Sequence, residues 1–86
     1  MKINTQKYIV RKFENETIFL DVKSGTSHIL DDVASLMLEY FEKYKENDVV
    51  LERLHDFFHN ADYAVIEKDY NNFVRELIEK DIIVYD

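Results

Sequence analysis

The sequence predicts an α+β fold in which a three-stranded antiparallel sheet is followed by three helices. The apolar pattern has a period of two as far as Leu30, and from Asp31 onward it changes to the helical period of about 3.6 residues. The chain of 86 residues contains no Pro and one Gly, so few positions interrupt regular structure. This length fits one domain, and we expect residues 1–86 to fold as a single unit.

Three short segments rich in β-branched and aromatic residues are predicted strands: Tyr8–Phe13, Thr17–Val22 and Ser27–Leu30. Gly25 lies between the last two, where a hairpin turn requires a positive φ. In the second segment the alternation separates two sets of side chains onto opposite faces of the sheet. One set is Ile18, Leu20 and Val22, and the other is Thr17, Phe19 and Asp21.

The first helix is predicted to begin after Asp31, a good N-cap residue placed directly before an apolar stripe. We expect Asn47 to end this helix and Asp48 to cap the second one. A third helix is predicted from about Val65. Its apolar stripe consists of Ile66, Tyr70, Phe73, Val74, Leu77 and Ile78. The terminal run Ile82–Tyr85 is expected to pair as a strand or to close the core.

The net charge of −7, from 18 acidic and 11 basic side chains, opposes partners that carry phosphates. Binding to nucleic acid depends on Lys and Arg, and so does binding to an anionic membrane. The chain has no Cys, no signal-peptide pattern and no apolar run long enough to span a bilayer. These features favour a cytoplasmic domain without disulfides, because small secreted domains often need them.

No arrangement of residues indicates catalysis or a bound metal. One Gly cannot form a glycine-rich phosphate loop, and no Ser-His-Asp grouping is apparent. His55 and His59 are four residues apart on the predicted second helix, but Asp56 stands where a zinc peptidase needs Glu, and no third ligand is evident. We therefore expect a protein that is not an enzyme and that uses no metal or cofactor.

Four segments, in this order and spacing, resemble PqqD and the wider set of recognition elements for ribosomally made precursor peptides. They are Tyr8–Arg11, Asp21–Gly25, His28–Asp31 and Asp69–Ile78. The resemblance extends from about Tyr8 to Tyr85. Family members often have Leu-Asn before the first helix where this chain has Leu30-Asp31, and often Gly after the last helix where it has Lys80-Asp81. Asp enters the left-handed conformation less readily than Gly.

The resemblance implies a winged helix-turn-helix-like fold and a non-catalytic peptide chaperone. In such proteins the leader of the precursor peptide adds as a strand to the third strand, and its side chains enter a groove beside the third helix. The partner enzyme is a separate protein such as a radical SAM enzyme, a cyclase or a peptidase. The peptide-binding residues implied here are Ser27, His28, Ile29, Leu30, Asp69, Tyr70, Phe73, Val74 and Leu77.

Other interpretations of the same residues stay open at this stage. An apolar stripe at helical spacing is usually core, which applies to Phe73 and Leu77, whereas Tyr70 and Asn71 suit a half-exposed groove. The element order also fits a winged-helix DNA-binding domain, although the third helix carries more acidic than basic side chains. A plain protein-interaction module, including a homodimer, is the remaining alternative.

Overall fold

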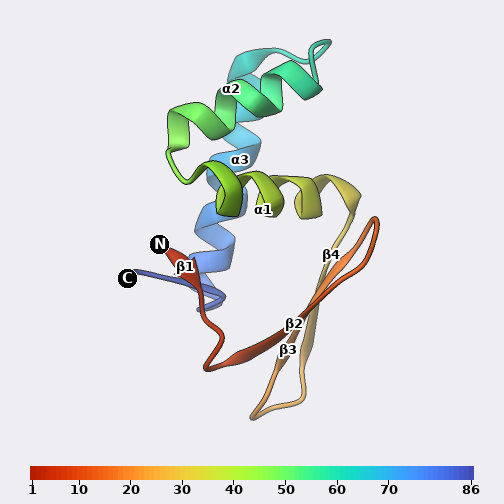
Figure 1. The fold of residues 1–86 in the computed structure, drawn as a ribbon, viewed down its shortest axis with the longest axis vertical. Helices are drawn as coiled ribbons and strands as arrows, with labels where there is room; N and C mark the ends of the chain where they lie inside the picture. Colours follow the sequence, from red (N-terminus) through yellow and green to blue (C-terminus); the bar gives the residue numbers. More distant parts are fainter.

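The computed structural model describes all 86 residues, and a three-stranded sheet followed by three helices confirms the α+β prediction. The sheet lies at one end of the molecule and the helices at the other, as Figure 1 shows. Helices α2 and α3 follow each other across a short turn, as a winged helix-turn-helix-like fold requires. The elements are β1 (Lys2–Ile3), β2 (Tyr8–Lys12), β3 (Thr17–Asp21), β4 (Ser27–Leu30), α1 (Asp32–Tyr44), α2 (Asn47–Phe57), α3 (Tyr63–Glu79) and β5 (Ile83–Val84).

The sheet has the strand order β2-β3-β4, and both pairs are antiparallel. The turn from β3 to β4 is fixed by Asp21, whose carboxylate accepts hydrogen bonds from the backbone N–H groups of Lys23 and Ser24. Those two bonds lower the pKa of the Asp21 carboxyl below its usual value. Gly25 follows with φ of 75°, so the predicted need for a positive φ is confirmed.

The helices cover the face of the sheet that carries Phe19, which is fully buried, together with Thr17 and Tyr8. The opposite face carries Leu20, Ile9 and other aliphatic side chains, yet it is exposed to solvent. The predicted division of β3 into two faces is therefore confirmed by the burial pattern. We call the covered side the inner face and the solvent side the outer face of the sheet.

Helix α1 begins as predicted, because the Asp31 carboxylate accepts a hydrogen bond of 2.8 Å from the Ala34 N–H. Its predicted end is wrong. The chain makes a γ-turn at Lys45, with φ of 63° and a bond of 2.7 Å from the Glu46 N–H to the Tyr44 carbonyl. Helix α1 thus stops at Tyr44, and α2 begins at Asn47 with Glu46, rather than Asp48, at its N-cap.

Helix α3 begins at Tyr63, two residues before the predicted start, and ends in a Schellman motif. The N–H of Asp81 donates to the Ile78 carbonyl and the N–H of Ile82 donates to the Leu77 carbonyl. Asp81 takes the left-handed conformation with φ of 57°. Ile82 and Leu77 are both buried, which provides the apolar contact that accompanies this motif.

The two ends of the chain pair with each other, which the sequence predicted only in part. Ile83–Val84 forms β5, so the expected terminal strand is confirmed, but its partner β1 was not predicted. A strand of two residues has too little pattern to be recognised. Asn4 also connects the two ends, since its backbone N–H donates a hydrogen bond of 2.8 Å to the Ile82 carbonyl. Both termini consequently lie side by side (Figure 1).

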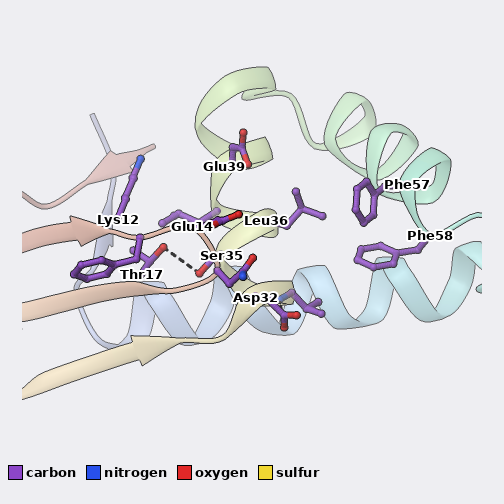
Figure 2. Close-up of a pocket in the computed structure, with 13 residues that line it drawn as sticks. Lys12, Glu14, Thr17, Asp32, Ser35, Leu36, Glu39, Phe57 and Phe58 are labelled. Atoms are coloured by element: carbon purple, nitrogen blue, oxygen red, sulfur yellow. Dashed lines mark hydrogen bonds between the residues drawn. The ribbon is translucent and has the colours of Figure 1, made fainter.

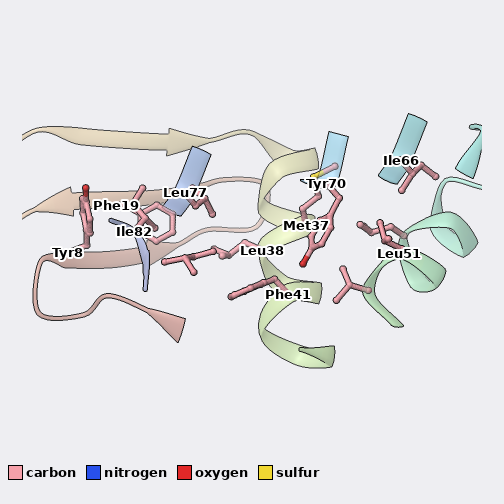
Figure 3. Close-up of a cluster of buried hydrophobic side chains, with 13 residues drawn as sticks. Tyr8, Phe19, Met37, Leu38, Phe41, Leu51, Ile66, Tyr70, Leu77 and Ile82 are labelled. Carbon is pink, nitrogen blue, oxygen red and sulfur yellow. The ribbon is translucent and has the colours of Figure 1, made fainter. Parts of the chain in front are cut away.

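One hydrophobic core connects the sheet with all three helices (Figure 3). It runs from Tyr8 and Phe19 on the inner face, through Leu38 on α1, to Leu51 on α2. Helix α3 contributes three buried side chains spaced along its length: Ile66, Tyr70 and Leu77. Because α3 touches the core over this whole length, it is held in a fixed position relative to the sheet.

Candidate functional site

The outer edge of β4 has no partner strand. The sheet order ends at β4, which pairs only with β3, and the short β1-β5 ribbon forms a separate sheet. An edge strand presents backbone N–H and C=O groups that an extended peptide can pair with. The expected unpaired edge at Ser27–Leu30 is thus present.

The hydrogen-bond pattern identifies which residues of β4 face this open edge. In an antiparallel ladder, hydrogen-bonded and non-hydrogen-bonded residue pairs alternate. The bond of 2.9 Å from the Asp21 N–H to the Thr26 carbonyl fixes the phase of the ladder. The pairs Ile18–Ile29 and Leu20–Ser27 are therefore non-hydrogen-bonded, so the backbone groups of Ser27 and Ile29 point outward.

The opposite edge of the sheet, on β2, is less available to a new strand. The same alternation directs the backbone groups of Tyr8, Val10 and Lys12 toward that edge. The N–H of Tyr8 already donates to the Asn4 carbonyl at 3.1 Å, and the Arg11 guanidinium donates to the Val10 carbonyl at 3.4 Å. No hydrogen bond from a loop or side chain reaches Ser27 or Ile29 in the same way. The β4 edge is therefore the more open of the two.

Helix α3 lies on the inner face, beside the sheet. Its C-terminal end is fastened there, because the Tyr8 hydroxyl donates a hydrogen bond of 2.6 Å to the Lys80 carbonyl. Tyr8 also meets the His28 ring edge-to-face, with 5.9 Å between the ring centroids. His28 and Leu30 point to this inner face, the side of the sheet to which the end of α3 is fastened.

Ile29 does not belong to that side, which corrects the expectation that it lines a groove with α3. Its register partner is Ile18, on the outer face, and its side chain is 63% exposed. Because successive side chains of a strand point to opposite faces, Ile29 lies on the other face from its neighbours His28 and Leu30. Ile29 consequently offers its backbone to an incoming strand and its side chain to the outer face.

Tyr70 is also placed differently from the expectation, since it is 1% exposed instead of half-exposed. Its ring points from α3 into the core beside Met37 of α1 (Figure 3). This burial raises the pKa of Tyr70 to about 12, because the charged phenolate loses its hydration. A change at Tyr70 would therefore disturb the core as well as any groove.

The other predicted residues of α3 divide between core and surface. Leu77 is buried, in agreement with the core interpretation. Phe73 and Val74 are half-buried and pack against the core, so each keeps an accessible side, and Asp69 is exposed. Of the predicted α3 residues, Phe73, Val74 and Asp69 therefore keep accessible surface.

Tyr8 is not among the predicted site residues, yet its side chain connects β4 and α3. Its ring meets both Phe19 and His28, and its hydroxyl holds the end of α3. The sequence feature that draws attention to Tyr8 is its position at the start of the Tyr8–Arg11 segment. That position predicts that Tyr8 belongs to a strand. It does not predict the contact with Lys80, because that contact depends on the tertiary fold.

The histidine pair of the predicted second helix is not on one helical face. Helix α2 ends at Phe57, so His59 lies in the turn that follows, while the His55 ring packs against Tyr63 at 5.6 Å. No group of three or more His, Cys, Asp or Glu side chains is arranged to hold a metal ion. None of the helices has the length and hydropathy that crossing a membrane would require.

Comparison with solved structures finds a protein of similar fold. No protein-family model matches the chain, and no curated protein matches it in sequence. The solved structure of TbiB1 in complex with the TbiA(beta) leader peptide is similar, with a TM-score of 0.83 and 24% sequence identity, and the match covers 100% of both chains. Over its full length, the chain has the α+β fold of TbiB1.

Proposed function

We propose that the chain is a non-catalytic recognition domain that binds the leader of a ribosomally synthesised precursor peptide and presents it to a modifying enzyme. The leader adds as a strand to the open edge of β4, and its side chains on the inner face lie beside α3. Residues 1–86 act as one PqqD-like domain in the cytoplasm, and the partner is a separate enzyme such as a radical SAM enzyme, a cyclase or a peptidase.

The single observation that carries this proposal is the open β4 edge at Ser27 and Ile29. Two residues with outward-pointing backbone groups offer two N–H donors and two C=O acceptors to an extended chain. The similarity to TbiB1, whose structure contains a leader peptide, supports a peptide as the occupant. The four segments that resemble PqqD-like proteins support the same class of ligand.

Backbone pairing alone gives weak binding, because each hydrogen bond contributes only about 0.5–1.5 kcal/mol net. A side chain of the leader that enters an apolar site must add affinity and specificity. His28 and Leu30 on β4, together with Phe73 and Val74 on α3, supply half-buried surfaces for it. Exposed Asp69 is suited to a basic residue of the leader.

The test is a titration of isotope-labelled protein with a synthetic peptide that has the sequence of a candidate leader, chosen from short reading frames near the gene for this chain. We expect amide shifts in Ser27–Leu30 and on the exposed side of Asp69–Leu77. A scrambled leader of equal composition is the control. Shifts confined to α2, with β4 unmoved, would show that the groove is misplaced.

A further inference from the structure

A second concave site lies on a different part of the molecule (Figure 2). It is a pocket of about 500 Å³ between the β2–β3 hairpin, the start of α1 and the end of α2. The residues that define it here are Phe13, Val33, Leu36, Leu38, Phe57 and Phe58, and we call it the α1–α2 pocket. Neither β4 nor α3 contributes to its lining, so it is separate from the proposed leader site.

Part of the apolar lining of this pocket is accessible to solvent. Phe13 is 59% exposed and Phe57 is 57% exposed, although both are large aromatic residues. The Phe57 and Phe58 rings meet edge-to-face with 4.8 Å between their centroids, which makes a firm aromatic wall. Exposed apolar surface gathered around a hollow is typical of an interaction site.

Thr17 and Ser35 make the polar part of the pocket rigid. The Thr17 hydroxyl donates to the Ser35 hydroxyl at 3.0 Å (Figure 2). The Ser35 hydroxyl donates in turn to the Leu30 carbonyl at 3.3 Å. This chain links the sheet to the first turn of α1. These two bonds fix the first turn of α1, which forms one wall of the pocket, relative to the sheet.

The charges around the pocket select the partner. Glu14, Asp32 and Glu39 lie among its lining residues. The single basic residue there is Lys12, and its ammonium group is already paired with the Glu42 carboxylate. An apolar hollow with a negative rim attracts an apolar side chain that has positive charges next to it.

We propose that the α1–α2 pocket docks a segment of a partner protein in which an aromatic or large aliphatic side chain is flanked by Lys or Arg. This goes beyond leader binding, because the pocket can be filled while an extended peptide lies on β4. The recognition domain then has two separate interaction surfaces.

The probe is the peptide acetyl-Lys-Phe-Lys-amide, titrated into isotope-labelled protein. We expect amide shifts at Phe13, Val33, Leu36 and Phe57, with β4 unmoved. The peptides acetyl-Glu-Phe-Glu-amide and acetyl-Lys-Ala-Lys-amide are expected to bind about three- to tenfold more weakly, as the loss of exposed ion pairs or of the anchor implies.

The double variant Glu14→Lys with Glu39→Lys reverses the charge of the pocket rim. The matched control is the double variant Glu52→Lys with Glu67→Lys. It changes the net charge by the same amount, at exposed positions outside the pocket. Only the rim variant is expected to prefer the acidic peptide. Three results would each overturn the proposal: equal effects of both variants, no shifts at the pocket residues at millimolar peptide, or occupation of the pocket by a second copy of the chain in the free protein.

Discussion

The Tyr8 hydroxyl donates a hydrogen bond of 2.6 Å to the Lys80 carbonyl across 72 residues of sequence. This bond joins the strand at one edge of the sheet to the C-cap of α3. Since the proposed leader site lies between the sheet and α3, the bond helps to set the spacing of its two walls.

Tyr8→Phe removes only this hydroxyl and tests its role. We expect the free energy of unfolding to fall by about 1 kcal/mol, the usual contribution of one such bond. Denaturant unfolding followed by circular dichroism measures the change. Tyr85→Phe is the control, because Tyr85 is exposed and its hydroxyl makes no hydrogen bond within the chain. Equal stability of wild type and Tyr8→Phe would show that the bond does not fasten α3.

Ile29→Pro tests strand addition. The N–H that it removes points to the open edge and not to β3, so we expect the sheet to stay folded while leader affinity falls about tenfold. Calorimetric titration measures the affinity. Ile29→Ala keeps the N–H and removes only an outer-face side chain, and Lys12→Pro makes the same backbone change at the β2 edge. Unchanged affinity in a folded Ile29→Pro variant would contradict pairing at β4.

Asp81→Gly is expected to stabilise the fold by about 0.5–1 kcal/mol, because Gly adopts the left-handed conformation without the steric cost that a Cβ brings. Thermal unfolding checks this. Lys80→Gly, at a residue with φ of −88°, is the matched control and should destabilise the protein. A lower melting temperature for Asp81→Gly would mean that losing the exposed Lys7–Asp81 ion pair costs more stability than the relaxed backbone conformation gains.

Tyr70 is expected to lose its proton at a higher pH than an exposed tyrosine, because burial raises its pKa to about 12 in the folded protein. In the unfolded chain the value is about 10. The stability that neutral Tyr70 contributes is therefore complete below about pH 10 and is lost as the pH rises toward about 12. The phenolate absorbance of wild type minus that of Tyr70→Phe measures the titration. A difference curve centred at about 10 in the folded state would contradict the burial of the Tyr70 side chain.

Duplex DNA is expected not to bind at physiological salt. The net charge is −7, and the exposed charges of α3 include Glu67, Asp69, Glu76 and Glu79, so the helix that would enter the major groove repels phosphates. A gel-shift assay with random duplexes checks this. Submicromolar, sequence-specific retention would favour the DNA-binding alternative.

Much of the fold follows from local rules in the sequence. The three strands, the Asp31 cap and the turn at Gly25 depend on neighbouring residues and were predicted close to their observed places. The α3 stripe was predicted for the same reason, since its spacing alone places the side chains on one side of a helix. The candidate β4 edge was likewise identified from the order of the strands.

Only the tertiary structure decided which surfaces are covered. The period of two separates Phe19 from Leu20 but does not say which of them meets the helices, because both are large and apolar. Packing against α1 and α3 buries Phe19 and leaves Leu20 exposed. The same contacts bury Tyr70 and leave Ile29 on the uncovered face of the sheet. Sequence spacing fixes which residues share a face, whereas burial depends on elements far away along the chain.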